Sequence, residues 1–386
     1  MYKIAVVGRG LIGSAAARHL AEAADGIACI GPDEPRTRST HDGVFASHYD
    51  EGRMTRYVDP TPEWSCTARE AIARYRDLEM RSGIGFYAPV GYLGLGYPGS
   101  TYNARCAATG AEHAAAIEHL DATALRHRYP YLAIDDDVDG LVETGGAGYI
   151  SPRRLVRAQT VLAERAGATC IRQAARAIRA VSSGVEIELW DGTVLAAERA
   201  LITAGAFTEV CGLSPANLGL TVFGRTTVLV RVEGAAAEAL ADMPTMIDTL
   251  LGAYILPPIS YPDGHAYLKI GVGDERDPNF AELGALQAWF RSAGSAGDRA
   301  RFTKRLKALF PVLRACPHWQ TDTCAVTVTK SGLPIVDFVL DEKIAVAVGG
   351  CGKAAKGSDE WGRIAAGLVL GTPWSSAVRR EKLALA

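Results

Sequence analysis

A glycine-rich turn at the start of the chain constrains the fold more than any other feature. The stretch YKIAVVG (2–8) is apolar and rich in β-branched residues, which predicts a buried strand. Gly8, Gly10 and Gly13 then follow the spacing G-x-G-x-x-G and open a helical pattern. The first glycine permits a tight turn, the second lets a pyrophosphate approach the backbone, and the third lets helix and strand pack closely. The turn predicts a Rossmann-like unit that binds a dinucleotide, with Leu11 and Ile12 at the helix end that holds phosphate.

The position of the acid that would bind the ribose departs from the usual pattern. The second expected strand, residues 26–31, normally ends in an acid about 20 residues after the glycines. Here the strand ends at Gly31, and Asp33 and Glu34 follow after a proline. Asp33 or Glu34 is therefore expected to reach the ribose, with Asp33 as the first candidate.

Composition excludes several classes of partner. The chain has 386 residues, 48% hydrophobic and 22% charged, with a net charge of −2, so neither nucleic acid nor an anionic membrane is an expected partner. No apolar run approaches the length of about 20 residues that a membrane span needs. The chain starts on a strand with no signal-peptide pattern, so we expect a cytoplasmic protein. The eight cysteines and eight histidines show no metal-ligand spacing, and no metal is expected.

A second segment distinguishes FAD from NAD. Residues 185–208, VEIELWDGTVLAAERALITAGAFT, predict two strands joined at the Asp191-Gly192 turn, and then a further buried strand ending at Thr203. This ending resembles the flavoprotein pattern in which a strand packs beside bound FAD. The resemblance implies that Ala204 and Gly205 contact FAD. A nicotinamide-dependent dehydrogenase is the alternative.

By these features the chain resembles the D-amino-acid-oxidase-like flavoproteins, within them the monomeric sarcosine oxidase and N-methyl amino acid oxidase branch. The resemblance covers nearly the whole chain. In the segment SHYDEGRMTRY (47–57), it implies that Arg53 lies near the flavin and that Arg56 binds the substrate carboxylate. The planar fork of arginine suits a carboxylate. The alternative is a solvated pair of arginines beside Asp50 and Glu51.

Two further segments supply lysines. AYLKIGVGDERD (266–277) resembles a family strand whose lysine promotes reaction with oxygen, which implies this role for Lys269; the alternative is an exposed lysine on an edge strand. KIAVAVGGCGKAAKG (343–357) predicts a strand and a glycine-rich loop before a helix. The resemblance implies that the loop, with Gly350, Gly352 and Lys353, lies at the flavin and that Lys356 pairs with the substrate carboxylate.

A fourth segment concerns the attachment of the cofactor. TDTCAVTVTKSGLPIVD (321–337) places Cys324 at the head of a predicted strand. The distance from Cys324 to Ile335-Val336-Asp337 matches the family cysteine that is bonded to the flavin. The resemblance implies a covalent bond between FAD and Cys324, and the alternative is an ordinary buried thiol.

The expected fold class is α/β, with α+β character in a second domain. A discontinuous Rossmann-like FAD-binding domain would comprise residues 1–85, 145–215 and 325–386. A mostly antiparallel β-sheet substrate domain would comprise residues 86–144 and 216–324. Ser151 and Pro152 are expected to begin the helix that leads into the middle FAD segment. Tyr254 and Tyr261 come from the expected roof of the pocket and either line it or pack within the sheet.

The predicted reaction follows from the resemblance. An FAD-dependent amine oxidase would oxidise the C–N bond of a small N-methyl, cyclic or primary amino acid to an imine, with oxygen reduced to hydrogen peroxide. Arg53, Arg56, Lys269, Lys356 and Tyr254 would form the catalytic site. The alternatives are an amino acid dehydrogenase that passes electrons to another acceptor, and a flavin-binding protein without activity.

Overall fold

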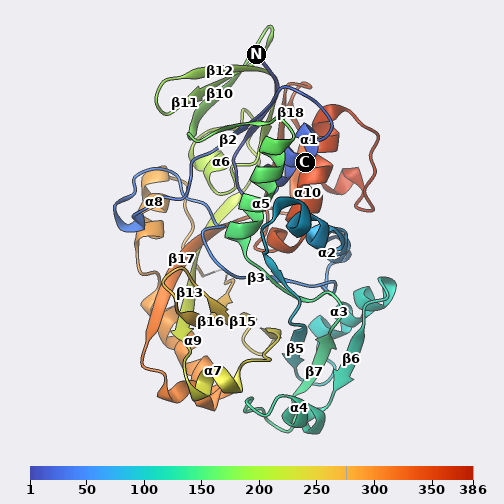
Figure 1. Ribbon diagram of the computed structural model, residues 1–386, viewed down its shortest axis with the longest axis vertical. Coiled ribbons are helices and arrows are strands. Elements are labelled where there is room, and N and C mark those ends of the chain that lie inside the picture. Colours follow the sequence, from blue (N-terminus) through green and yellow to red (C-terminus); the bar gives the residue numbers. More distant parts are fainter. Residues whose placement is uncertain (275, 386) are drawn as a thin grey trace.

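The computed structural model describes residues 1–274 and 276–385. Its elements gather in two regions, each built on an eight-stranded sheet (Figure 1). In the first sheet β10, β11, β12, β1, β2 and β9 lie side by side, while β19 joins β12 and β18 joins β19. Its strands are β1 (Tyr2–Val7), β2 (Ile27–Ile30), β9 (Thr169–Ile171), β10 (Ala175–Val181), β11 (Gly184–Leu189), β12 (Val194–Ile202), β18 (Ile335–Leu340) and β19 (Ile344–Val348).

The centre of the first sheet is parallel, because β1 pairs in parallel with β2 and β12, and β12 pairs in parallel with β19. Helix α1 (Leu11–Ala21) packs between α10 (Ser358–Leu370) and α5 (Pro152–Arg165), and α2 (Pro62–Ser82) packs on α10 (Figure 1). Small side chains make this close approach possible: a Cβ on Gly362 of α10 would overlap the backbone of α1 at Ala16. The first and last parts of the chain therefore pack together in one unit.

The second sheet has the order β17-β13-β16-β15-β14-β5-β7-β6, and only β14 and β5 pair in parallel. The predicted mostly antiparallel sheet is present. Its strands are β5 (Tyr92–Gly96), β6 (Ile117–Leu120), β7 (Asp139–Glu143), β13 (Thr221–Arg231), β14 (Thr245–Asp248), β15 (Ala253–Ser260), β16 (Ala266–Val272) and β17 (Trp319–Val328). A small third sheet joins β3 (Arg53–Thr55), β8 (Gly148–Ile150) and β4 (Tyr87–Ala88).

Short helices complete the fold around the sheets. The α-helices are α3 (Thr101–Glu112), α4 (Ala122–Arg128), α6 (Phe207–Val210), α7 (Ala235–Ala239), α8 (Leu283–Arg291) and α9 (Ala296–Leu309). The 3₁₀ turns are η1 (Arg38–Thr40), η2 (Pro311–Ala315), η3 (Ala354–Gly357) and η4 (Arg380–Lys382). Phe302 and Leu306 of α9 belong to the buried core beneath the second sheet. Helix α9 therefore shares a hydrophobic core with the second sheet.

Several local expectations can be compared with the structure. Ser151 caps α5 by accepting a hydrogen bond from Arg154 N, and Pro152 begins that helix, as predicted. The turn at Asp191-Gly192 joins β11 and β12, but the separate third strand expected after it is wrong, since β12 runs unbroken to Ile202. The division into two domains remains a prediction, and β17 crosses its boundary at residue 325.

Candidate active site

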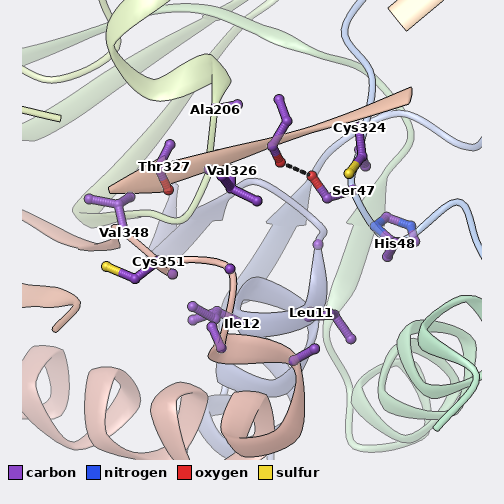
Figure 2. A pocket seen from close by; sticks show the side chains of 18 of the residues that line it. Leu11, Ile12, Ser47, His48, Ala206, Cys324, Val326, Thr327, Val348 and Cys351 are labelled. Carbon is purple, nitrogen blue, oxygen red and sulfur yellow. Dashed lines mark hydrogen bonds between the residues drawn. The ribbon is translucent and has the colours of Figure 1, made fainter. Parts of the chain in front are cut away.

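A cavity of about 650 Å³ is lined by residues from both large sheets. Figure 2 shows part of its wall: Cys324, Val326 and Thr327 follow one another along β17, opposite the start of α1. Most of the predicted site residues line it, namely Gly8, Gly10, Leu11, Ile12, Arg53, Arg56, Ala204, Gly205, Tyr254, Cys324, Gly350, Gly352, Lys353 and Lys356. Gly13, Asp33 and Lys269 are not in its wall. Segments that are far apart in the sequence thus meet around one cavity.

The glycine turn is as tightly packed as its sequence predicts. Gly8 has a φ of +114°, and a Cβ there would overlap the backbone of Thr203 at the end of β12. A Cβ on Gly13 would overlap the carbonyl oxygen of Gly8 and the hydroxyl of Thr203. Only glycine avoids these overlaps, so the turn, the helix and β12 are held in direct contact.

The wall beside the turn is suited to an anion. Helix α1 has no side-chain cap and no acidic residue in its first turn, so its free N–H groups are available. A Cβ on Gly10 would find only His48 Nδ1 within 4 Å, at 4.0 Å, so the backbone is open here. His48 Nδ1 is buried and makes no hydrogen bond with the described residues. Open amides and an orphaned polar atom fit the phosphates of FAD.

His48 is held in its neutral form. Burial, with a further contribution from Arg9, lowers the pKa of His48 to about 3. The imidazole is therefore uncharged at neutral pH, with one nitrogen able to donate and one able to accept. A bound anion beside it would relieve the unfavourable cationic surroundings.

The predicted ribose acid lies outside the cavity wall. Asp33 forms an ion pair with Arg9 and another with Arg172 at 2.9 Å, while Glu34 pairs with Arg153. A Cβ on Gly31 would lie 2.7 Å from Arg9 N, so close approach of β2 to the glycine turn explains the glycine that ends this strand. The ribose contact of Asp33 remains a prediction.

Cys324 lies in the cavity wall on β17. Its carbonyl oxygen accepts a hydrogen bond from Trp289 Nε1 at 3.0 Å, and Ser47 Oγ donates to the next carbonyl, Ala325 O, at 2.7 Å (Figure 2). Burial raises the pKa of the Cys324 thiol, and the nearby Arg53 acts in the opposite direction. Burial thus favours the neutral thiol of Cys324, and the charge of Arg53 opposes this effect.

Asp50 binds two of the predicted catalytic cations. Lys269 Nζ donates to Asp50 Oδ2 and, at 2.7 Å, to Gly52 O, and Arg53 pairs with the same carboxylate. Lys269 is 2% exposed on the interior strand β16, so the alternative of an exposed lysine on an edge strand is wrong. Burial, and next Arg53, lowers the pKa of Lys269 well below its ordinary value. Lys269 therefore lies behind the cavity wall rather than in it.

A second cluster gathers around Asp59. Its buried carboxylate accepts a hydrogen bond from Lys356 Nζ, lies 3.2 Å from Lys353 Nζ and 3.7 Å from Arg56 Nη2. Burial alone would raise the pKa of Asp59, but the three cations hold it well below its usual range. Burial lowers the pKa of Lys356 to about 8, with Asp59 acting against it. Three cations thus share one carboxylate in the cavity wall.

Arg56 is fixed in orientation. Its Nε donates to Val58 O at 2.7 Å and its Nη2 to Tyr102 Oη at 2.6 Å. The guanidinium also lies over the ring of Tyr92, 4.7 Å from the centroid. Arg56 is 6% exposed, so the alternative of a solvated arginine pair is wrong for this residue. Its Nη1 donates to Met54 Sδ at 2.6 Å, so three neighbours hold the guanidinium in the cavity wall.

The two roof tyrosines differ in position. Tyr254 lines the cavity and lies 6.0 Å from Lys269 Nζ, measured to the ring centroid. Tyr261 is not in the cavity wall but donates from Oη to Asp50 Oδ1 at 2.7 Å. Tyr254 can therefore contact a ligand directly, while Tyr261 supports Asp50.

Comparison with known proteins identifies the family. The family model described as DAO, FAD dependent oxidoreductase, matches residues 3–368. The chain belongs to this family. N-methyl-L-tryptophan oxidase of Escherichia coli (strain K12) is 27% identical over 218 residues, and that of Yersinia pestis (strain Pestoides F) is 23% identical over 210 residues. Each match covers 54% of this chain and 55% or 54% of the relative, so the aligned region spans about half the length of these curated relatives.

Solved structures of similar fold cover the whole chain. NikD, an amino acid oxidase of nikkomycin biosynthesis, has a TM-score of 0.77 at 19% identity and covers 100% of this chain and 97% of its own. Glycine oxidase of Geobacillus kaustophilus has a TM-score of 0.75 at 20% identity, with 100% and 98% covered. These likenesses confirm the predicted fold class of a DAO-family oxidoreductase.

Two absences hold for residues 1–274 and 276–385. No His, Cys, Asp and Glu side chains gather there in a group of three or more that would hold a metal ion. No helix among them is both long and apolar enough to cross a membrane.

Sequence reasoning missed Asp59, and it treated Asp50 only as a neighbour of two arginines. Asp59 stands three residues after Arg56, but this spacing brings charges together on a helix, and residues 56–59 form a loop. Tyr102 and Arg225, which also line the cavity, carried no signal in the sequence.

Proposed function

We propose that this chain is an FAD-dependent amine oxidase that oxidises the C–N bond of a small amino acid to an imine. Oxygen would accept the electrons and become hydrogen peroxide. The family and the named relatives support oxidation by FAD, while the substrate and the acceptor are part of the proposal. FAD, when bound, supplies the acceptor for a hydride from the carbon that carries nitrogen.

The observation that carries the proposal is the buried pair Arg56 and Lys356 in the wall of the cavity that also contains the glycine turn. Both side chains are at most 6% exposed, and the carboxylate that pairs with them is Asp59. With Lys353 the cluster has more positive than negative groups. A substrate carboxylate would be attracted to this excess charge and would orient the amine toward the cofactor.

Cofactor binding would use the open amides at Gly10 and the start of α1 for the pyrophosphate, with His48 beside them. Ala204, Gly205 and the Gly350–Gly352 loop would contact FAD elsewhere in the cavity. Cys324 would form the covalent bond to the flavin. Acid precipitation tests this bond: yellow colour that stays with the protein pellet supports it, and colour in the supernatant contradicts it.

The roles of the remaining residues follow from their charge. Lys269 would favour the transfer of electrons to oxygen, since a buried ammonium stabilises developing negative charge. Arg53 would lie near the flavin, and Tyr254 would border the bound substrate.

The test of the function is bleaching of the flavin colour by a panel of N-methyl, cyclic and primary amino acids under anaerobic conditions. We expect bleaching by at least one of them and production of peroxide when air is admitted. Arg56→Ala and Lys356→Met should raise the required substrate concentration at least tenfold, because each removes a charged partner of the carboxylate. Lys330→Met, at an exposed turn, is the matched control. Unchanged bleaching in both site variants contradicts the proposal.

The second candidate function is a dehydrogenase that passes electrons to an acceptor other than oxygen. It is favoured by the ion pair of Lys269 with Asp50, which reduces the free charge near the cavity. A dye-reduction assay run beside the peroxide assay separates the two. Reduction of dye without peroxide identifies the dehydrogenase.

A further inference from the structure

Two of the cations near the proposed flavin site are bound to a single acid. Lys269 of β16 and Arg53 of β3 both pair with Asp50, which is 8% exposed. Lys269 makes a second hydrogen bond to Gly52 O at 2.7 Å, so its ammonium is held against the loop before β3. This arrangement fixes both the position and the electrostatic surroundings of the lysine.

The cluster lies directly behind the cavity wall. Arg53, Cys324 and Tyr254 all line the large cavity, and Lys269 Nζ lies 6.0 Å from the Tyr254 ring centroid. A second cavity of about 10 Å³ is lined by Asp50, Arg53 and Cys324 among others. Asp50 and Cys324, the proposed attachment point of the flavin, therefore line the same small cavity.

Asp50 accepts hydrogen bonds from donors on several elements. Tyr261 Oη donates to Asp50 Oδ1 at 2.7 Å, and the backbone N–H of Glu51 donates to the same oxygen at 2.8 Å. Together with the two cations, these donors favour the carboxylate over the neutral acid. The neighbouring acids have other partners, since Glu51 pairs with Arg153 and Asp322 with Arg38.

A carboxylate in contact with a buried ammonium cancels much of the electric field of that ammonium. The interaction of unit charges is strong in a buried site, so the sign and number of the fixed charges decide how anions are stabilised there. With Asp50 present, protonated Lys269 and Arg53 together act as a single positive charge. Without Asp50 the same two side chains would present two at any pH at which Lys269 keeps its proton.

We propose that Asp50 is a positioning residue that restrains the reaction of the reduced cofactor with oxygen by offsetting the charge of Lys269. In this reaction two electrons and two protons pass from the reduced flavin to dioxygen, and the products are oxidised flavin and hydrogen peroxide. The first electron transfer makes superoxide, an anion, so it is faster where positive charge is uncompensated. The inference rests on the proposed function because it assumes that bound FAD lies beside this cluster.

The experiment uses the holoenzyme and no amine. The flavin is reduced anaerobically by light with EDTA and a deazaflavin, and its reoxidation is followed after mixing with oxygenated buffer. We expect D50N to reoxidise at least tenfold faster than the unmodified protein and K269M to reoxidise no faster. D25N removes an acid from an exposed turn beyond α1 and serves as the matched control.

Two further measurements separate an electrostatic effect from a structural one. The reduction potential of the bound flavin should become more positive in D50N, because a negative charge near the ring is removed. The reoxidation rate is also measured from pH 6 to pH 9, since burial would favour loss of the Lys269 proton once Asp50 is gone. If D50N reoxidises faster only at low pH, the proposal is supported, because the acceleration then depends on protonated Lys269.

The proposal is overturned if the reoxidation rate of D50N is unchanged or slower over the whole pH range and the reduction potential of its flavin is unchanged. If D50N does not retain flavin, Asp50→Ser removes the same charge with a smaller side chain and is judged by the same criteria. Failure of every amine to bleach the flavin would contradict the proposed function but would leave this comparison of rates intact.

Discussion

The buried ammonium of Lys356 donates to Oδ2 of Asp59, across a separation of 297 residues in the sequence. Lys356 belongs to the turn η3 before α10, and Asp59 follows β3. Both side chains line the cavity. This ion pair joins the N-terminal and C-terminal segments at the place where a substrate carboxylate is proposed to bind.

The charge of Lys356 makes binding of carboxylates dependent on pH. Burial lowers its pKa to about 8, so the ammonium is present below that pH and lost above it. A bound carboxylate favours the protonated lysine, so the Kd should be constant near pH 6 to 7 and rise by up to about tenfold per pH unit above about 8. Acetate, which is ionised over this range, is titrated against the flavin absorbance of the holoenzyme. A Kd that does not change up to pH 9.5 would contradict this role for Lys356.

Removal of Asp59, the ion-pair partner of Lys356, should shift the pH dependence of carboxylate binding. Asp59→Asn deletes the anion that opposes the effect of burial, so the pKa of Lys356 falls further and the rise in Kd begins at a lower pH. Loss of one partner of a buried pair should also lower the free energy of unfolding by about 3 kcal/mol. Both quantities are measured, by acetate titration over pH and by urea unfolding. Asp77→Asn, at a half-exposed position of α2, should change neither.

The glycine turn offers a matched pair of variants. A Cβ at Gly13 would overlap Gly8 and Thr203, so Gly13→Ala should destabilise the fold by about 2 kcal/mol or more and reduce the yield of flavinated protein. A Cβ at Gly10 has open space and an ordinary φ of −84°, so Gly10→Ala should fold normally. The added methyl group would nevertheless occupy the approach of the pyrophosphate. We expect at least tenfold weaker retention of FAD in a Cys324→Ser background, in which the cofactor is free to dissociate. Equal retention in Gly10→Ala and its parent would count against phosphate binding at this turn.

The parts of the site that could be predicted from sequence are those whose constraints are local. Gly8 and Gly13 are required by a turn between adjacent elements, so their spacing alone identifies the nucleotide-binding unit. Ser151 caps a helix with which it is contiguous. The family resemblance predicted that Arg56, Lys356 and Cys324 belong to one site. All three line the same cavity, although each comes from a different part of the chain.

The parts of the site that could not be predicted from the sequence depend on packing between distant segments. Lys269 alternates with Leu268 and Ile270 along β16, and this periodicity does not reveal that β13 and β15 cover the strand on both sides. Asp59 becomes a shared counter-ion because β3, which precedes it, packs against η3. Asp33 follows the expected strand, but close approach of Gly31 to Arg9 directs it to arginine partners instead of the cavity. Charge partners of this kind are set by the tertiary fold.

His48 provides the last prediction, since its Nδ1 atom is buried without a partner. An unsatisfied polar atom destabilises the protein without cofactor, so His48→Leu should leave the stability of that form unchanged or raise it by about 1 kcal/mol. The same substitution removes a hydrogen-bonding group beside the proposed phosphate site. FAD should therefore bind more weakly to His48→Leu by about tenfold in the Cys324→Ser background, while His48→Gln, which keeps a polar group, should retain most of the affinity.

Calorimetry in buffers of different ionisation enthalpy adds a second measure for His48. Burial and Arg9 hold the imidazole neutral before binding, and a nearby phosphate would raise its pKa from about 3. If the pKa rises past the working pH, FAD binding is accompanied by proton uptake that His48→Leu abolishes. If the pKa stays below it, no uptake occurs and the affinity difference alone reports the contact. Equal affinity of the parent and both variants would show that His48 does not contact the cofactor, because the loss of a buried hydrogen bond to an anion costs more than 1 kcal/mol.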